Sequence, residues 1–299
     1  MPNLSKALIL ASIAAIAAYL YPLALSFLTS HISSISSLPS LTPYLPSPFQ
    51  PAVSPQPYTC PNHTYSPTII SLSPLLILLQ NFIPPAERRS LISTGTPLLT
   101  ASPITGSGTD VPDTNTRTSS SAPLPADDAV VSCVLARARA LLGPGVLREG
   151  RDDMGAPQMV RYTAGQRFDV HADWFARPRL DPADGEAGRR RLYNRVATVF
   201  VVLENNSTAG GETWFPRVEV EGEGGGAAGG GGGDGEGLWR VHEEGGIEFR
   251  PVPGNALFWV NLLPDGTGDA RVVHAGLPIL DGVKTGMNIW PRTFFGPDA

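Results

Sequence analysis

The apolar positions of this chain change their period about halfway along it. Over residues 127–142 apolar side chains recur every three or four positions, which predicts an amphipathic helix. Beyond residue 159 they form short runs between turn residues, which predict strands at 159–162, 167–171, 196–203, 247–249, 256–260, 271–274 and 287–290. Helices first and many strands afterwards favour a β-sandwich or barrel with helices packed outside it.

Two elements are predicted before this helix. Residues 69–79 are mostly apolar and predict a strand or buried segment, and Pro-Pro-Ala-Glu at 84–87 is typical of a helix start. Three ranges are expected to be flexible insertions because they are rich in Ser, Thr, Pro, Gly or acidic residues: about 100–125, 178–190 and 219–245. The glycine run in the last range lacks the Lys-Ser/Thr of a phosphate-binding loop.

The N-terminal residues form an apolar segment followed by a polar one. A helix over residues 7–28 would be about 33 Å long, enough to span a bilayer core of roughly 30 Å. A cleaved signal peptide is the alternative, with a shorter apolar run at 8–21 and a small-x-small pattern at 24–26. We therefore predict a signal-anchor or signal peptide at 1–29, a Ser/Pro-rich stalk at 30–65 and a folded domain at 66–299.

Either interpretation of the N-terminus sends the domain into the endoplasmic reticulum or the secretory-pathway lumen, and an anchor would make it a single-pass type II membrane protein. Asn-x-Ser/Thr glycosylation patterns at Asn62, Asn205 and Asn206 fit this location. Cys60 and Cys133 could form a disulfide there, although Cys133 also fits a buried free thiol in the predicted helix.

The charge of the chain limits the partners it can bind. The formal net charge is −5 and the sequence pI is near 5.5. A nucleic-acid-binding protein needs a basic face for the phosphate backbone, so we expect no nucleic-acid partner.

Three side chains are candidates for a metal site. His171 and Asp173 are two residues apart in a strand-like run, so in an extended strand they project from the same face. Such a pair is too common to be specific. Together with His274, in another strand-like run, it would complete a two-His-one-carboxylate triad that leaves one face of an octahedral iron open. His242 borders the glycine run and is expected to be exposed.

Lys284 is the one lysine in the predicted domain, because the other lysine of the chain is Lys6. An ammonium group is costly to bury unless it meets an opposite charge. Lys284 follows His274 by ten residues, across a turn at 278–282. It is a candidate partner for a small dicarboxylate, and an exposed lysine on a turn is the alternative.

Seven short motifs that contain or flank these candidate residues follow one another in an order typical of a known protein family. They are Arg-Tyr-Thr-Ala-Gly-Gln at 161–166, His-Ala-Asp at 171–173, Gly-Gly-Glu-Thr-Trp-Phe-Pro at 210–216, Pro-Gly-Asn-Ala-Leu-Phe-Trp at 253–259, His-Ala-Gly-Leu-Pro at 274–278, Gly-Val-Lys at 282–284 and Asn-Ile-Trp-Pro-Arg at 288–292. In this order they resemble the prolyl 4-hydroxylase alpha-subunit-like family of Fe(II)- and 2-oxoglutarate-dependent dioxygenases. The resemblance covers roughly residues 74–295 and is strongest from residue 161.

The resemblance implies a mainly β fold with flanking helices and a double-stranded β-helix core, the jelly roll of cupin-like proteins. It implies that the catalytic metal ligands are His171, Asp173 and His274. Lys284 would pair with the distal carboxylate of 2-oxoglutarate, with Tyr162 and Thr198 as hydrogen-bonding helpers.

Four further motif residues have mainly structural interpretations. Gly210 and Gly211 are expected to satisfy the backbone of a turn. Glu212 is interpreted as structural rather than as a catalytic acid, and Trp290 either lines the pocket or belongs to the core.

The implied reaction consumes 2-oxoglutarate and O2 at Fe(II), with L-ascorbate as reductant, and releases succinate and CO2. The implied substrate is a peptidyl proline in a proline-rich polypeptide, hydroxylated at carbon 4; partner subunits are unknown.

Two other functions remain open, a dioxygenase for another side chain or small molecule and a non-catalytic cupin-like binding protein. A zinc hydrolase fits less well, because it should carry a nearby general base and no such lysine.

Overall fold

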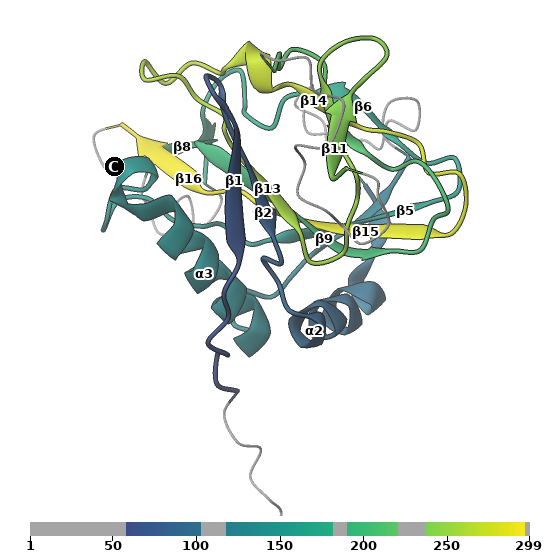
Figure 1. Cartoon of the computed structure of the whole chain (residues 1–299). Helices are drawn as coiled ribbons and strands as arrows, with labels where there is room; N and C mark the ends of the chain where they lie inside the picture. Colours follow the sequence, from purple (N-terminus) through teal and green to yellow (C-terminus); the bar gives the residue numbers. More distant parts are fainter. Residues whose placement is uncertain (1–57, 103–117, 182–189, 221–236, 297–299) are drawn as a thin grey trace, which may run out of the picture. The chain divides into compact units, whose positions relative to one another are not determined.

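The computed structural model describes residues 58–102, 118–181, 190–220 and 237–296. The predicted membrane segment and the stalk up to residue 57 lie outside these ranges, as does the glycine run at 221–236. The described residues form three antiparallel sheets and two longer helices (Figure 1).

Two of the sheets build the core of the fold. The larger has eight strands, in the order β1 (Ser66–Leu72), β2 (Leu75–Gln80), β13 (Ala256–Val260), β9 (Ala197–Asn205), β15 (Val283–Ile289), β5 (Gln158–Thr163), β4 (Ser120–Pro123) and β3 (Thr100–Ala101). The smaller has five, in the order β11 (Trp239–Val241), β12 (Ile247–Phe249), β10 (Thr213–Phe215), β14 (His274–Gly276) and β6 (Phe168–His171). A third sheet joins β16 (Arg292–Phe295), β8 (Leu192–Arg195) and β7 (Arg179–Leu180).

The chain winds back and forth between the two larger sheets. It passes from β5 in the larger sheet to β6 in the smaller, returns to β9, continues through β10 and β12, and then alternates through β13, β14 and β15. All of these strands pair antiparallel. This alternation is the double-stranded β-helix, so the predicted jelly-roll fold is confirmed.

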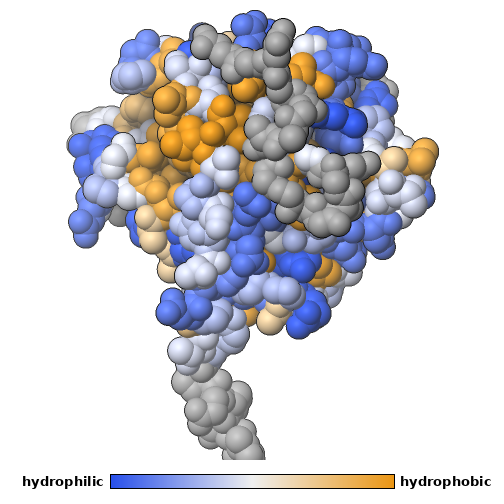
Figure 2. Space-filling model, viewed as in Figure 1, coloured by the Kyte–Doolittle hydropathy of each residue, from blue (hydrophilic) through white to orange (hydrophobic). Residues whose placement is uncertain are grey.

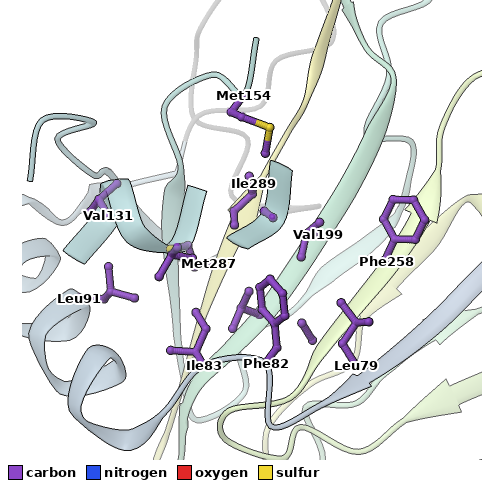
Figure 3. Close-up of a cluster of buried hydrophobic side chains, with 14 of the residues drawn as sticks. Leu79, Phe82, Ile83, Leu91, Val131, Met154, Val199, Phe258, Met287 and Ile289 are labelled. Carbon is purple, nitrogen blue, oxygen red and sulfur yellow. The ribbon is translucent and has the colours of Figure 1, made fainter. Parts of the chain in front are cut away.

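The helices cover the outer face of the larger sheet. α2 (Pro85–Gly95) and α3 (Ala129–Val146) share one apolar core with that sheet (Figure 3). In β9, Val199 and Val201 belong to this core, whereas Phe200 and Val202 belong to the core between the sheets. The period of two along a strand explains why β9 is apolar on both faces.

Side-chain hydrogen bonds set the ends of α3. The Asp128 carboxylate accepts bonds from the amides of Val130 and Val131 at 2.9 and 3.0 Å, which caps the helix at the N-terminal end of the predicted range. Near the other end Gly143 adopts a positive φ of 59°, which interrupts the helix after its predicted end.

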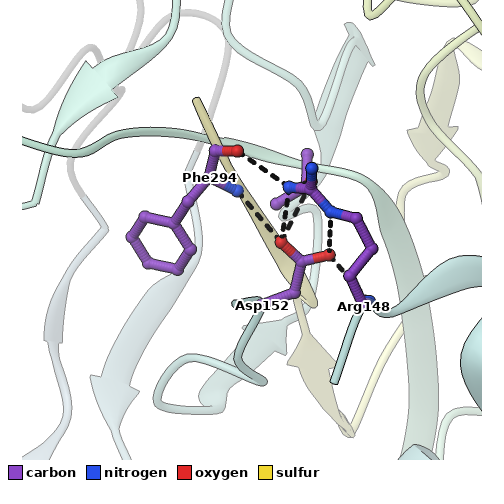
Figure 4. Close-up of polar contacts among 4 residues, drawn as sticks. Arg148, Asp152 and Phe294 are labelled. Carbon is purple, nitrogen blue, oxygen red and sulfur yellow. Dashed lines mark hydrogen bonds and ion pairs between the residues drawn. The ribbon is translucent and has the colours of Figure 1, made fainter. Parts of the chain in front are cut away.

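A polar cluster then ties the residues after α3 to β16 (Figure 4). Arg148 donates to both carboxylate oxygens of the buried Asp152 and to the carbonyl of Phe294. The Phe294 amide and the Thr293 hydroxyl also donate to Asp152. Because every partner is satisfied, the cluster fixes the third sheet against the helix layer.

A disulfide between Cys60 and Cys133 attaches the segment before β1 to α3. Of the two alternatives for Cys133, a disulfide with Cys60 or a buried free thiol, the structure shows the disulfide. Within the described residues, α3 is also the one helix long and apolar enough by composition to cross a membrane. Its apolar side chains pack on the sheet, as those of a core helix do.

Several predicted elements differ from the structure. Residues 69–79 form the hairpin of β1 and β2 rather than one segment, because a turn at 73–74 reverses the chain. Residues 270–272 form a 3-10 turn, so β14 begins only at His274. Short strands that hydrophobic periodicity does not reveal lie inside the ranges expected as insertions, namely β3, β4, β7 and β11.

An apolar surface lies around the end of β1 that leads into β2 (Figure 2). Leu72 is 77% exposed there, and it lines a groove of about 740 Å³ with Leu263 and Phe295. This groove shares no lining residue with the cavity described next.

Candidate metal and cosubstrate site

The structure brings His171, Asp173 and His274 together at one end of the jelly roll. His171 ends β6, Asp173 follows two residues later, and His274 begins β14, where it is the register partner of His171. The Nε2 atoms of His171 and His274 lie 3.8 and 3.7 Å from the two carboxylate oxygens of Asp173. The three groups can offer ligand atoms within 4.8 Å of one another.

Hydrogen bonds orient both imidazoles toward the centre of this cluster. The Nδ1 of His171 lies 2.8 Å from the Asp169 carbonyl oxygen, and the Nδ1 of His274 lies 3.1 Å from that of Val272. A carbonyl oxygen accepts a hydrogen bond, so Nδ1–H is the donor in each ring and Nε2 is the nitrogen that faces Asp173. Metal-binding histidines are oriented in this way.

Aromatic rings hold the two imidazoles from outside. The ring of Phe168 stacks on His171 with centroids 3.5 Å apart. Trp259 and Phe215 contact His274, at centroid distances of 4.7 and 5.4 Å. These contacts restrict the rotation of both histidines and keep water from one side of the cluster.

The Asp173 carboxylate is held by a chain of hydrogen bonds. Thr198 donates to its Oδ2 at 2.8 Å, and the side-chain amide of Asn261 donates to the Thr198 hydroxyl at 2.9 Å. Burial of Asp173 opposes its ionisation, but the nearby His274 and His171 outweigh that effect and lower its pKa. The carboxylate is therefore available as an anionic ligand.

The donor set fits a divalent transition metal. Two atoms that each lie about 2.1 Å from one ion can be at most about 4.2 Å apart, and the two His–Asp distances are below that limit. Two imidazoles and one carboxylate on one side, with an open cavity on the other, suit Fe(II).

A cavity of about 470 Å³ adjoins this cluster. Its wall contains the three candidate ligands and also Lys284, which lies on β15. Aromatic and polar side chains from several strands complete the lining, among them Tyr162, Phe200, Thr213, Asn288 and Trp290. A volume of this size is typical of small-molecule sites.

Lys284 is buried with no carboxylate in ion-pair contact among the described residues. Its side chain is 2% exposed, and the ammonium donates a hydrogen bond to the Gly211 carbonyl. It also lies 5.3 Å from the ring centroid of Phe200 and 5.7 Å from that of Tyr162. Burial lowers the pKa of Lys284 to about 8, and the charge of Glu212 opposes this shift. An unneutralised buried cation favours an anionic ligand.

The two predicted helper residues occupy different positions. Tyr162 is the register partner of Lys284 and lines the cavity beside it. Thr198 is fully buried behind the cluster, does not line the cavity, and uses its hydroxyl for Asp173. Its observed contact is with the carboxylate, and a role toward 2-oxoglutarate stays a prediction.

Gly210 and Gly211 lie just before β10, where Gly210 forms an isolated β-bridge with Ile279 rather than a turn. Both adopt positive φ, at 82° and 79°. A Cβ atom at Gly210 would come within 2.2 Å of the Pro278 carbonyl oxygen, so only glycine fits there. The backbone requirement is confirmed.

One expectation about the histidines is wrong. His242 is not exposed, because it stacks on Trp214 with centroids 4.4 Å apart and its side chain is 15% accessible. Its Nε2 lies 3.7 Å from the buried Glu248, to which Arg240 also donates. This cluster packs the smaller sheet and lies outside the cavity lining.

Sequence reasoning missed Arg195 and Asn261. Arg195 donates to the Asp173 carbonyl at 3.1 Å, and its guanidinium lies 3.5 Å from the ring centroid of Trp290. Arg195 lies at the end of β8, three residues before Thr198. This short distance along the chain from a predicted site residue is the feature of the sequence that could have identified Arg195. Asn261 had no local signal, because it reaches Thr198 from the far end of β13.

The segment of the chain that holds this site is similar to known proteins. Residues 157–292 match the model of the 2OG-Fe(II) oxygenase superfamily. The chain is 30% identical over 133 residues to "Probable prolyl 4-hydroxylase 4" of Arabidopsis thaliana, 44% of this chain and 40% of that protein. It is 28% identical over 225 residues to "Probable prolyl 4-hydroxylase 3" of the same plant, 74% of this chain and 70% of that protein.

A third relative comes from an animal. The chain is 32% identical over 133 residues to "Prolyl 4-hydroxylase subunit alpha-1" of Gallus gallus, 44% of this chain and 20% of that protein. The chain thus spans less than half the length of several of the curated relatives it matches. A solved viral collagen prolyl hydroxylase from Paramecium Bursaria Chlorella virus-1 aligns with a TM-score of 0.49 and 20% identity, over 73% of this chain and 96% of that one.

Proposed function

We propose that this chain is an Fe(II)- and 2-oxoglutarate-dependent dioxygenase that hydroxylates peptidyl proline at carbon 4. The support is the match of residues 157–292 to the model of the 2OG-Fe(II) oxygenase superfamily and the similarity to prolyl 4-hydroxylases. The reaction consumes O2 and 2-oxoglutarate and releases succinate and CO2. L-ascorbate would serve as the reductant.

One observation carries this proposal. A single cavity contains both a two-His-one-carboxylate donor set and a buried ammonium group. 2-Oxoglutarate has a keto acid at one end, which can chelate a metal, and a carboxylate at the other, which a cation can neutralise. The non-catalytic alternative gives no reason to retain both groups, because either one alone would suffice for binding.

The residues of the chain divide the work of binding. His171, Asp173 and His274 would hold Fe(II), which when bound supplies the redox chemistry for oxidative decarboxylation and C–H hydroxylation. Lys284 binds the distal carboxylate of 2-oxoglutarate, and the Tyr162 hydroxyl donates a hydrogen bond to the same carboxylate. Thr198 keeps the Asp173 carboxylate in its ligating rotamer. The fully buried Trp259 and Phe215 exclude water behind His274, and Phe168 stacks on His171 at the cavity wall.

The choice of proline as substrate is supported by the similarity to prolyl 4-hydroxylases and by the shape of the cavity. Its wall contains aromatic side chains, among them Phe168 and Phe200, which suit the apolar surface of a pyrrolidine ring. A proline-rich polypeptide in an extended polyproline conformation is the corresponding partner.

We place this activity in the lumen of the secretory pathway, with residues 7–28 as a signal-anchor. The support is the length of that apolar segment and the Cys60–Cys133 disulfide, which persists in an oxidising compartment. Asn62 lies in an exposed glycosylation sequon and is the proposed site of glycan attachment.

The test is release of succinate from 2-oxoglutarate by the full chain in detergent, with Fe(II) and ascorbate, with and without proline-rich peptides. We expect peptide-stimulated turnover and hydroxyproline in the product. His171→Ala and Lys284→Met should abolish it, whereas His242→Ala, a histidine outside the cavity, should retain it. The absence of succinate under every condition would exclude the dioxygenase, and turnover without any proline product would exclude the substrate.

A further inference from the structure

Two arginines and two aromatic rings alternate along one wall of the cavity. The guanidinium of Arg179 lies 4.1 Å from the ring centroid of Phe175, and that of Arg195 lies 4.9 Å from the same ring. Arg195 in turn lies 3.5 Å from the ring centroid of Trp290. All four residues line the cavity, so this Arg–aromatic ladder faces any molecule that enters it. Phe175 and Arg195 each have two such neighbours and Arg179 has one, and these contacts limit the motion of the planar groups.

Backbone pairing also fixes the position of Arg179. It begins β7, where it is the register partner of Tyr193 in β8, and β8 pairs with β16. Tyr193 packs edge-on against Phe175, with centroids 5.7 Å apart. Arg179 is therefore held by a sheet and an aromatic cluster, and its charge has a defined place at the cavity wall.

The two cations of the ladder have different surroundings. Arg195 donates to the Asp173 carbonyl, which commits it to positioning the candidate metal ligand. Arg179 has no ion pair with any residue that the structure describes; its contact is with the face of Phe175.

Nearby acidic groups are already engaged. Asp169 pairs with Arg167 at 2.7 Å, and Asp181, two residues after Arg179, pairs with Arg292 at 3.1 Å. Besides Lys284, which the proposed function assigns to 2-oxoglutarate, the cavity wall therefore offers Arg179 as a cation that no described carboxylate neutralises.

We propose that Arg179 is a specificity-determining residue that selects substrates with an acidic side chain close to the target proline. The inference rests on the proposed function, because it assumes that the cavity admits a peptide. A planar guanidinium stacked on a ring presents its N–H edge, the geometry that binds a carboxylate in a bidentate manner. A carboxylate at the C-terminus of a peptide has the same chemistry, so the two sources must be separated by experiment.

The test measures binding to the metal-free full chain in detergent, by fluorescence anisotropy of labelled peptides. Three proline-rich peptides differ only in charge: an internal Glu with an amidated C-terminus, the same peptide with Gln, and the Gln peptide with a free C-terminus. At low ionic strength we expect the Glu peptide to bind about fivefold more tightly than the amidated Gln peptide. Raising the salt concentration to about 0.5 M should reduce this ratio, because salt screens the pair.

Three variants assign the preference to one residue. In Arg179→Gln the affinity ratio of the Glu and Gln peptides should fall to about one, and in Arg179→Glu a peptide with Lys in place of Glu should become the preferred ligand. Arg177→Gln is the matched control. Arg177 is exposed and does not line the cavity, so its loss removes the same charge from the same segment and should leave the ratio unchanged.

Equal affinities of the wild-type chain for the Glu and Gln peptides, including binding of both too weak to measure, would overturn the proposal. So would a ratio that Arg177→Gln reduces as much as Arg179→Gln does. Tighter binding of the peptide with a free C-terminus than of the peptide with an internal Glu would show that Arg179 recognises a terminal carboxylate and not an acidic side chain. Because no metal is present, these results are independent of succinate release, and each of the two proposals can fail without the other.

Discussion

The hydroxyl of Thr198 donates a hydrogen bond of 2.8 Å to the carboxylate of Asp173. Both side chains are almost fully buried, and the amide of Asn261 supports the same hydroxyl. The hydrogen bond connects the core of the larger sheet with the end of β6, so the packing of the jelly roll sets the rotamer of the only carboxylate in the candidate triad.

Replacing Thr198 with Val should weaken metal binding without unfolding the protein. The substitution preserves the shape of the side chain but leaves the Asp173 oxygen and the Asn261 amide without their partner. Loss of such a supporting bond lowers metal affinity by roughly 10- to 100-fold. The measurement is a titration of the metal-free protein with Mn(II) or Co(II), with Thr198→Ser as the control that retains a hydroxyl. Equal affinities of the Val and Ser variants would contradict the positioning role.

Lys284 should make 2-oxoglutarate binding depend on pH. Its pKa is lowered to about 8, so the free site loses its positive charge as the pH rises through 8. The KM for 2-oxoglutarate should then increase by about tenfold for each further pH unit, because only the protonated lysine pairs with the distal carboxylate. The check is KM measured from pH 6.5 to 9.5. A KM that stays constant over this range would show that the lysine does not bind the cosubstrate.

The same lysine should reduce the stability of the protein. Its ordinary pKa is 10.5, so below pH 8 the unfolded chain holds the proton more favourably than the buried side chain does. This difference destabilises the native state by up to roughly 3 kcal/mol, and the penalty disappears as the pH rises from 8 to 10.5. Lys284→Met should therefore raise the free energy of unfolding at pH 7 while it abolishes cosubstrate binding. Chemical denaturation of both proteins at pH 7 and pH 10 tests this, and a destabilised variant at pH 7 would refute it.

Asp152 should contribute to acid unfolding. Burial raises its pKa, but the hydrogen bonds from Arg148 and from the Phe294 amide outweigh burial and lower the pKa overall. A lowered native pKa means that the stabilisation is present above the ordinary pKa near 4 and is lost as the pH falls below it. Asp152→Asn should be less stable at pH 7 and should show a shallower loss of stability between pH 5 and pH 2. Parallel pH profiles of the two proteins would contradict this assignment.

The Cys60–Cys133 disulfide should stabilise the domain. It links residues 73 positions apart, for which the chain-entropy model gives about 4 kcal/mol. Cys60→Ser removes it at an exposed position and leaves the buried Cys133 in place. Urea unfolding should show a loss of roughly 2–4 kcal/mol, and the reductant that destabilises the wild type should have no effect on the variant. A midpoint unchanged by the substitution would show that the bond does not constrain the unfolded chain.

Local features of the sequence determined much of the fold and the candidate site. The short apolar runs between turn residues beyond residue 159 predicted β5, β6, β9, β12 and β13, because each strand buries at least one apolar face. The His171-x-Asp173 spacing and the single lysine of the domain gave candidates, and the resemblance of the ordered motifs to a dioxygenase family predicted the metal ligands and the dicarboxylate partner.

Tertiary structure decided what local spacing could not. The register that sets His274 opposite His171, and the burial of Lys284 beside Tyr162, result from pairing between strands more than 100 residues apart in the chain. The contact of Thr198 with Asp173 and the ladder from Arg179 to Trp290 depend on which faces of different sheets meet. A sequence specifies which side chains can do chemistry, but non-local packing determines which of them share a cavity and which remain unneutralised there.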